Sequence, residues 1–310
     1  MTSQLQIERR DERRAVERYR GRFAWRIVAE FLVSLVLWVG VIVLGVTGVI
    51  PLWLGLLLNA PIATTFYMPL HEATHGNIWG AHRRGKWGQD LIGAISSVPL
   101  GFDYFAHRIS HMHHHAFTND PARDPDRYTD GPLRELPIAW WGSVLVQTLF
   151  PLIVFVPASR RLLPAKVVGR IGFPDPYDPS AIAMGKASLR FWVVTHLALV
   201  AAFIFGFGWD ALLLWYVPAR LSVGWLQFVF AWFPHHPADR VGRYVDTRVA
   251  VFRGSTLLIR GHDHHALHHL FPRVPHYHLP ALWQEIGPGL TAKGVRTEGR
   301  ALGATGPIVW

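Results

Sequence analysis

The 310-residue sequence predicts an all-α integral membrane protein with four transmembrane helices arranged as two hairpins. Half of the residues are apolar and only 17% are charged, whereas soluble domains carry roughly 25% charged residues. Four long stretches are almost free of charge, and nearly all of the basic residues behind the net charge of +10 lie outside them. The absence of cysteine excludes a disulfide framework, thiolate metal sites and iron–sulfur clusters.

The first hairpin is predicted from residues 31–70, which include no charged side chain. One crossing needs about 20 apolar residues, so this stretch is long enough for two helices with a tight turn at residues 48–51. The second hairpin is predicted from residues 191–209 and 211–234, which are separated by a turn and interrupted only by Arg220. The charged residues ahead of residue 31 argue against a cleavable signal peptide.

Residues 136–159 are also uncharged, but three prolines, Pro137, Pro151 and Pro157, interrupt them. Both flanks of this segment are basic, so a crossing would place one basic flank on the wrong side of the membrane. We therefore expect a re-entrant or interfacial segment that does not cross, packed on protein.

The distribution of basic residues predicts the orientation. Of the 31 Lys and Arg residues, only Arg220 lies within a predicted crossing. The two hairpin turns contain no Lys or Arg. Because basic residues stay on the cytoplasmic side, the turns should face outward and the remaining segments should form a cytoplasmic helical cap.

Composition divides the chain into three parts. Residues 1–26 are predicted to be a basic N-terminal interfacial segment, helical from residue 8. Residues 27–286 form the membrane domain. Residues 287–310 are rich in glycine and lack helical periodicity, so a loosely held C-terminal tail is expected.

Three histidine clusters stand out among the 18 histidines, namely HEATH at residues 71–75, HMHHH at 111–115 and HDHHALHH at 262–269. On a helix, positions i, i+3 and i+4 share one face, so HxxxH presents two imidazoles together and HxxHH presents three. One HxxxH pattern and two HxxHH patterns present eight imidazoles in total. This number is too large for one metal ion and sufficient for two. Neutral imidazole suits Fe, Zn, Cu or Ni, so the ligand type alone leaves the metal open.

At these residues the sequence resembles the membrane fatty acid desaturase superfamily, which also contains carotenoid and sterol oxygenases. That superfamily carries an HxxxH or HxxxxH box followed by two HxxHH boxes, which stand here as HEATH, HMHHH and HALHH. Flanking residues match as well, with Arg108 and residues 118–119 around the second box and Leu-Phe-Pro at 270–272 after the third. The resemblance runs from about residue 31 to residue 280.

The resemblance implies a non-haem di-iron centre that uses O2 and two electrons to attack an unactivated C–H bond. It implies fatty acyl desaturation first, and hydroxylation or ketone formation on a carotenoid, sterol or alkyl chain as the alternative. It also implies a ligand at the end of the last crossing, His235, with His236 as the fallback. The implied iron ligands are His71, His75, His111, His114, His115, His235, His265, His268 and His269.

Other polar residues near the boxes are candidates to hydrogen-bond the ligand imidazoles and so fix their orientation. The carboxylates are Glu72, Asp120 and Asp263. The histidines are His107, His113, His236, His262 and His264.

Two other classes of function remain open. HEATH is also HExxH, the zinc metalloprotease signature, in which Glu72 would be the general base. A metal carrier or haem-binding electron protein would need polar ligands at depth in the crossings, where His196 and Arg220 are nearly alone.

The expected partners are a lipid acyl chain or isoprenoid substrate, the membrane lipids and a separate electron donor. The cysteine-free sequence cannot supply an iron–sulfur module, so electrons should arrive from a reduced protein such as a ferredoxin. The basic cytoplasmic face would attract an acidic donor. No nucleic-acid role is needed, because membrane orientation accounts for the basic charge.

Overall fold

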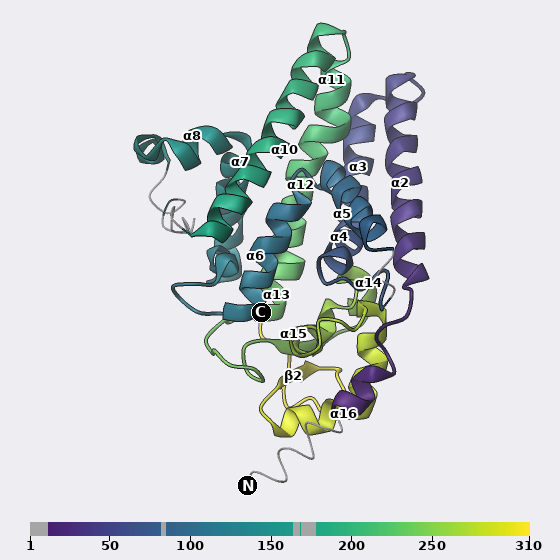
Figure 1. Ribbon diagram of the computed structural model, residues 1–310, viewed down its shortest axis with the longest axis vertical. Coiled ribbons are helices and arrows are strands. Elements are labelled where there is room, and N and C mark those ends of the chain that lie inside the picture. Colours follow the sequence, from purple (N-terminus) through teal and green to yellow (C-terminus); the bar gives the residue numbers. More distant parts are fainter. Residues whose placement is uncertain (1–11, 82–84, 164–167, 169–177) are drawn as a thin grey trace.

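The computed structural model describes residues 12–81, 85–163, 168 and 178–310. Residues 1–11 of the predicted interfacial segment lie outside these ranges. The described chain is mostly helical, with upright helices above a cap of short elements (Figure 1).

The first apolar stretch forms α2 (Trp25–Val46), α3 (Leu52–Thr65) and α4 (Tyr67–Thr74), with the turn at the predicted place. Gly48 in that turn has a φ of +75°, a conformation that favours glycine. The helix is interrupted at Phe66 because Pro69 has no N–H to donate to the carbonyl of Thr65. That carbonyl accepts from Arg260 at 3.2 Å instead.

The second hairpin consists of α10 (Pro179–Ile204) and a continuous helical stretch from Gly208 to His235. Two π-helical segments lie within that stretch. Its parts are α11 (Gly208–Ala211), η5 (Leu212–Tyr216), α12 (Val217–Leu226), η6 (Gln227–Trp232) and α13 (Phe233–His235).

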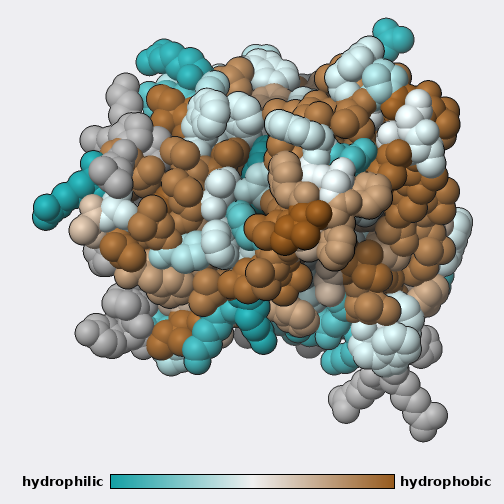
Figure 2. Space-filling view, turned by 90° about the horizontal axis from the view of Figure 1, so that it is seen from above, coloured by the Kyte–Doolittle hydropathy of each residue, from teal (hydrophilic) through white to brown (hydrophobic). Residues whose placement is uncertain are grey.

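Among the described residues, three helices are long and apolar enough to cross a membrane, namely Trp25–Val46, Pro179–Ile204 and Gly208–His235. The fourth expected crossing does not reach this length because of the interruption at Phe66. Large apolar side chains on these helices are exposed, such as Val36 at 71% and Ile204 at 74%. Apolar residues also cover much of the surface seen from above (Figure 2). These features indicate membrane association.

The proline-rich segment forms α7 (Leu136–Thr148) and α8 (Phe150–Phe155), which meet at Leu149. Pro151 lacks the N–H that would continue α7. Neither helix reaches the length of about 20 residues that a crossing needs. Figure 1 shows the pair beside α10, at the edge of the bundle.

Helices α5 (Lys86–Leu100) and α6 (Tyr104–Phe117) lie within the bundle, level with α4 and α12 (Figure 1). The cap contains α14 (Ser255–Leu258), α15 (His265–Leu270), α16 (Leu279–Ala292) and one small sheet. Short 3-10 turns lie at Pro125–Thr129, Leu133–Glu135, Pro157–Leu162, His262–His264 and His276–His278.

The expectation of a loose tail at residues 287–310 is wrong, and the all-helical expectation is corrected with it. Helix α16 continues to Ala292, and β2 (Arg296–Gly299) then pairs in parallel with β1 (Arg248–Val251). The buried Arg248 holds this arrangement, because its Nη1 donates to Glu298 at 2.8 Å and to the carbonyl of Val309 at 2.7 Å.

The described part of the N-terminal segment also contacts the cap. Residues 12–17 are helical, and Glu12 accepts from Lys293 at 2.6 Å beyond the end of α16. Tyr19 donates to Glu285 on the same helix. These contacts fasten the segment to α16.

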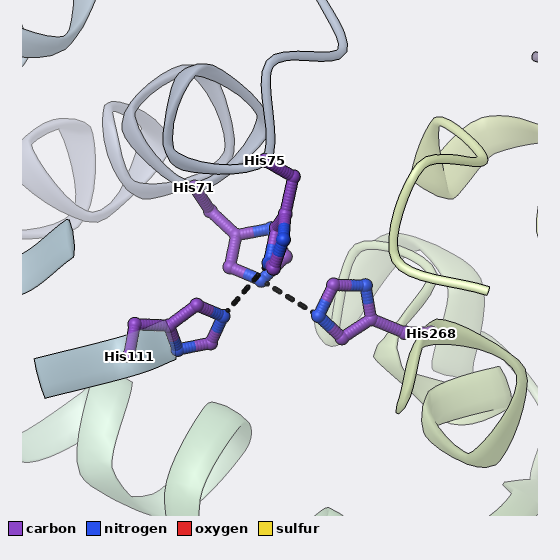
Figure 3. Close-up of side chains that lie close together, drawn as sticks. All are labelled: His71, His75, His111 and His268. Atoms are coloured by element: carbon purple, nitrogen blue, oxygen red, sulfur yellow. Dashed lines mark hydrogen bonds between the residues drawn. The ribbon is translucent and has the colours of Figure 1, made fainter. Parts of the chain in front are cut away.

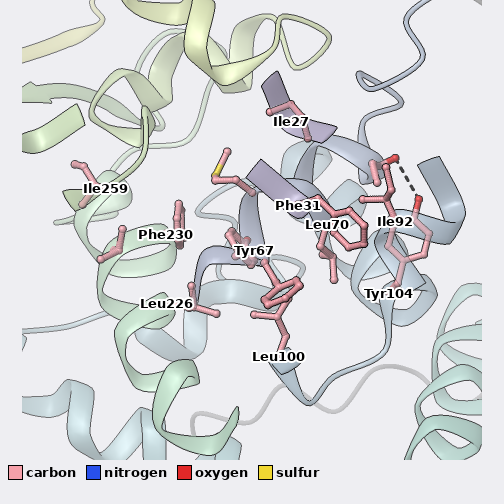
Figure 4. Close-up of a cluster of buried hydrophobic side chains, with 14 of the residues drawn as sticks. Ile27, Phe31, Tyr67, Leu70, Ile92, Leu100, Tyr104, Leu226, Phe230 and Ile259 are labelled. Atoms are coloured by element: carbon pink, nitrogen blue, oxygen red, sulfur yellow. Dashed lines mark hydrogen bonds between the residues drawn. The ribbon is translucent and has the colours of Figure 1, made fainter. Parts of the chain in front are cut away.

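A buried apolar cluster joins the bundle to the cap (Figure 4). Ile27 and Phe31 of α2 pack with Leu70 of α4 and Phe230 of η6. Tyr104 of α6 belongs to the same cluster and donates to the carbonyl of Ala73 at 3.2 Å. The core therefore fixes α4 relative to α6, the two helices that carry the first two histidine boxes.

Candidate metal centre

The nine histidines named as ligands converge with their Nε2 atoms facing one another. His71, His75, His111 and His268 form one group, in which one ring nitrogen of each lies within 4.8 Å of the others (Figure 3). His114, His235, His265 and His269 form a second group by the same criterion. His115 Nε2 lies 3.1 Å from His111 Nε2 and 3.0 Å from His268 Nε2, so it joins the first cluster.

Each HxxHH box divides its imidazoles between the two clusters. On α6, His111 and His115 belong to the first cluster and His114 to the second. On α15 the division is reversed, with His268 in the first cluster and His265 and His269 in the second. Helix α4 completes the first cluster and the end of α13 completes the second. His235, and not the fallback His236, is the residue brought into the site.

Local sequence explains how α6 presents its box. The side chain of Asp103 caps the helix by accepting from the backbone N–H of Ala106 at 2.8 Å. At the other end, Thr118 Oγ1 donates to the carbonyl of His114 at 2.8 Å and lies 3.1 Å from His269 Nδ1. One hydroxyl thus links the second box to the third.

Asp124 is a carboxylate beside a ligand imidazole, and it is not among the carboxylates that the sequence predicted. Asp124 Oδ1 lies 2.7 Å from His114 Nδ1 and so directs His114 Nε2 into the second cluster. Asp120, the predicted candidate, pairs with Arg123 and caps the following turn instead. The signal for Asp124 was the Asp-Pro-Asp sequence at residues 124–126, which places an acceptor in a turn soon after the box.

The other two predicted carboxylates are buried but contact different partners. Glu72 Oε1 accepts from the backbone N–H of His276 at 2.9 Å, and Glu72 Oε2 accepts from Asn77 at 2.6 Å. Asp263 contacts His264 Nδ1 at 2.9 Å and Ser255 at 2.8 Å. Both carboxylates hold the segments around the third box and do not contact a clustered imidazole.

The remaining predicted histidines fall into two groups. His113 packs at a tilt against Phe117 and His236 stacks on Trp232, with ring centroids 4.6 and 4.3 Å apart, and neither belongs to a cluster. His107 and His262 are near the first cluster, because their rings lie 5.2 Å from His111 and 5.0 Å from His71.

The electrostatic surroundings favour neutral rings in the clusters. Burial lowers the pKa of His268 well below its usual range, and the neighbouring His71 and His115 lower it further. Burial likewise lowers the pKa of His111, His115, His265 and His269. Burial alone would also lower the pKa of His114, but Asp126 and Asp124 outweigh it and raise that pKa. A neutral imidazole keeps the lone pair that a metal needs.

The spacing of the nitrogens fits metal ligands better than mutual hydrogen bonds. In the first cluster, Nε2 contacts of 2.9–3.1 Å run in an unbroken chain through His75, His111, His115, His268 and His71. Each Nε2 carries either one hydrogen or one lone pair, so a middle ring cannot satisfy two neighbours fully. Two nitrogens bound to one ion at about 2.1 Å lie roughly 3.0–3.4 Å apart, which matches these contacts.

A cavity of about 390 Å³ opens against both clusters. His111, His114 and His265 line the end at the histidines. The rest of the wall is mainly apolar and comes from α7, α8, α10, α12 and η6. Its apolar members include Val146, Phe150, Val154, Ala181, Met184, Val223, Leu226 and Phe230. The proline-broken segment therefore forms one wall of this cavity.

A separate polar cleft of about 290 Å³ reaches the clusters from another side. His115 of the first cluster and His269 of the second both line it, and their rings stack with centroids 4.2 Å apart. Arg123 and Arg243 also line this cleft. Both clusters therefore present one imidazole to the same opening.

Comparisons with known proteins identify a family. The model of the family described as fatty acid desaturase matches residues 47–298. An sn-1 acyl-lipid omega-3 desaturase (ferredoxin) of Synechocystis sp. is 25% identical over 75% of this chain and 66% of its own length. The protein of the same name from Nostoc sp. is 26% identical over 72% of this chain and 65% of its own length.

A plant protein is similar as well. A bifunctional desaturase/conjugase of Vernicia fordii is 27% identical over 73% of this chain and 63% of its own length. The chain thus spans just under two thirds of the length of each of these three relatives.

Proposed function

This chain belongs to the fatty acid desaturase family, and we propose on that basis that it is an oxidoreductase that places a double bond in the acyl chain of a membrane lipid. The relatives described above are named for acyl-lipid desaturation, which favours an acyl substrate over an isoprenoid one. The observation that carries the proposal is the convergence of nine imidazoles at the wall of an apolar cavity.

The proposed cofactor is a pair of iron ions, one held by each histidine cluster. Bound there, iron would supply the activation of O2 that allows hydrogen to be removed from an unactivated C–H bond. The all-nitrogen ligand set and the lowered pKa of His268 support metal binding. The metalloprotease alternative gains no support, because Glu72 is buried and both of its oxygens are hydrogen-bonded to His276 and Asn77.

The residues around the cavity would position the chain and exclude water. Apolar walls from α7, α8 and α10 would hold methylene groups against His111, His114 and His265. A dry cavity also protects a reactive oxidant from side reactions. In the overall reaction, –CH2–CH2– and O2 with two electrons and two protons give –CH=CH– and two molecules of water.

The two electrons are proposed to come from a separate ferredoxin-like protein. Two of the relatives carry ferredoxin in their names, and this cysteine-free chain has no iron–sulfur ligands of its own. The cleft beside His115 and His269 would be an approach to the clusters from water. Two arginines and two aspartates line it, so attraction of an acidic donor would come from the net charge of +10 of the whole chain, and the reduction rate should then fall as salt rises.

The proposed membrane arrangement has four crossings with the metal centre on the cytoplasmic side. Helices α3 and α4 together would make the second crossing, in spite of the interruption at Phe66. The segment of α7 and α8 would enter the membrane without crossing it. A protease or label that reaches the α10–α11 turn from the cytoplasm would contradict this arrangement.

Lipid analysis of cells that produce the protein tests the proposed reaction. We expect acyl chains with one additional double bond from the unchanged protein, none from His268→Ala and a full yield from His113→Ala. The last variant is the matched control, because His113 packs against Phe117 and belongs to neither cluster. Hydroxylated chains or altered isoprenoids in place of new double bonds would contradict acyl desaturation.

A further inference from the structure

Two basic side chains within the predicted crossings, His196 and Arg220, line one cavity of about 170 Å³. His196 comes from α10 and Arg220 from α12. This smaller cavity lies beside the large one at the histidine clusters, and the two share a wall. The shared residues are Phe102, Asp103, Val146, Gln147, Phe150 and Ser188.

Arg220 is a buried cation without a carboxylate partner. Its exposed fraction is 7%, and within the described ranges it forms no ion pair. Its Nη1 donates to the carbonyl of Gly101 at 3.0 Å and to Gln147 Oε1, and its guanidinium lies over the Tyr216 ring. Its Nε is buried and has no hydrogen-bond partner. An ionisable residue at this depth is costly and points to a polar ligand.

The free groups around the cavity are donors. Gln147 Oε1 accepts from Arg220, so the amide N–H groups of Gln147 remain available. His196 is already paired, since its Nδ1 donates to the carbonyl of Trp192 at 2.8 Å and its Nε2 lies 3.5 Å from Tyr216 Oη. The amide of Gln147 therefore calls for an acceptor, and Arg220 adds a positive charge to the same wall. Asp103 on the same wall disfavours an anionic one.

We propose that this cavity is a subsite for a neutral, oxygen-bearing group of the lipid substrate, held by Arg220 and Gln147. This proposal rests on the proposed function, because the identification of the ligand as an acyl lipid comes from there. The oxygen has two possible sources, which share this chemistry: the ester carbonyl of an acyl lipid or an oxygen function near the distal end of its chain.

The subsite would set which carbon reaches the metals. Phe230 lines the large cavity near the histidines. Arg220 lies ten residues before it on the same helical stretch. That separation is on the order of 15 Å along the helix. A chain anchored by its oxygen at Arg220 would place a defined methylene group at the clusters.

Binding of three lipids to the full-length, detergent-purified protein tests the subsite. The probes are a dioctadecanoyl phosphatidylglycerol, its ether-linked analogue without ester carbonyls, and the ester lipid with a keto group near the chain end. Affinities are measured by partition of radiolabelled lipid, without reductant, so turnover does not enter the result. Arg220→Met and Gln147→Leu remove the two donors. Asn59→Leu is the matched control, because it removes a buried hydrogen bond to the Leu214 carbonyl away from both cavities.

An ester subsite predicts that the ester lipid binds at least about tenfold more tightly than the ether lipid. If the subsite instead binds an oxygen near the distal end of the chain, the keto lipid should bind at least about tenfold more tightly than the plain ester lipid. Either preference should disappear in Arg220→Met and Gln147→Leu and persist in Asn59→Leu. If Arg220→Met does not fold, the result for Gln147→Leu alone tests the subsite.

Equal binding of all three lipids, or a preference that survives in the donor variants, would overturn the subsite. Failure to find new double bonds in cells would refute the proposed reaction without changing these affinities.

Discussion

Asp124 accepts a hydrogen bond from His114 and also from the backbone N–H groups of Asn119 and Asp126. One carboxylate therefore ties a clustered imidazole to the turn that follows α6. The Nδ1 of His114, which does not face the cluster, fixes the orientation of that ring through Asp124, and this partner is a short-range feature that box spacing does not reveal.

Asp124→Asn should weaken metal binding at the second cluster by about 10–100-fold, because the amide is a poorer acceptor for His114 Nδ1. Competition with a graded series of chelators measures this affinity. Asp120→Asn is the matched control, since Asp120 pairs with Arg123 and touches no clustered ring. Equal metal affinity in the two variants would remove Asp124 from this role.

Glu72→Gln should destabilise the fold by about 1–3 kcal/mol while leaving the metal content unchanged. The carboxylate accepts from both His276 and Asn77, whereas the amide keeps one acceptor oxygen and would place N–H groups against the donor of one of them. Thermal unfolding with parallel metal analysis measures both quantities. Glu285→Gln, which breaks a surface pair with Arg18, should cost less than about 1 kcal/mol. Loss of metal in Glu72→Gln would contradict this interpretation.

At the scale of single elements, α6 and α15 each supply both clusters, with opposite division of their HxxHH imidazoles. Spacing alone correctly indicates that three rings share one helical face. The spacing cannot predict which cluster each ring joins, because that depends on how α6 and α15 face each other. The first cluster receives five imidazoles and the second receives four.

His269→Ala should lower metal affinity more than His268→Ala does, because it leaves the second cluster with three imidazoles, whereas the first keeps four. Titration of the metal-free variants with iron, followed by metal analysis per chain, measures the difference. His113→Ala should bind as the unchanged protein does. Full metal content with full affinity in His268→Ala would exclude the third box from the first cluster.

Long apolar elements were the most predictable. Uncharged runs predicted α2, α10 and the helix that ends at His235, because length and composition alone decide such helices. The interruption at Phe66 depends on Pro69 and on a distant partner, Arg260, for the carbonyl it frees. Strand β2 has no alternating pattern of its own and forms because β1 and the buried Arg248 are beside it. Such partners are not visible in local sequence.

At the scale of the whole molecule, the clusters join four segments of chain that lie between residues 71 and 269. The apolar core of Figure 4 fixes the helices that carry two of them. Bound metal would therefore act as a long-range crosslink between the bundle and the cap, and its removal would loosen contacts that hydrophobic packing only partly secures.

Removal of metal by a chelator should lower the melting temperature by roughly 5–10 °C, since a ligand at 1,000 times its Kd adds about 4 kcal/mol to stability. Scanning fluorimetry of metal-loaded and stripped protein in the same detergent measures this shift. A double variant, His71→Ala with His235→Ala, weakens both clusters and should show a much smaller shift. Identical melting temperatures before and after stripping the unchanged protein would contradict the crosslink.

The crossed division of α6 and α15 has a mechanical consequence. Any rotation or slide of either helix moves nitrogens in both clusters at once, so one cluster cannot be distorted while the other keeps its shape. The distance between the two centres is thus built into the pitch of an α-helix, and a change in that distance requires unwinding a turn.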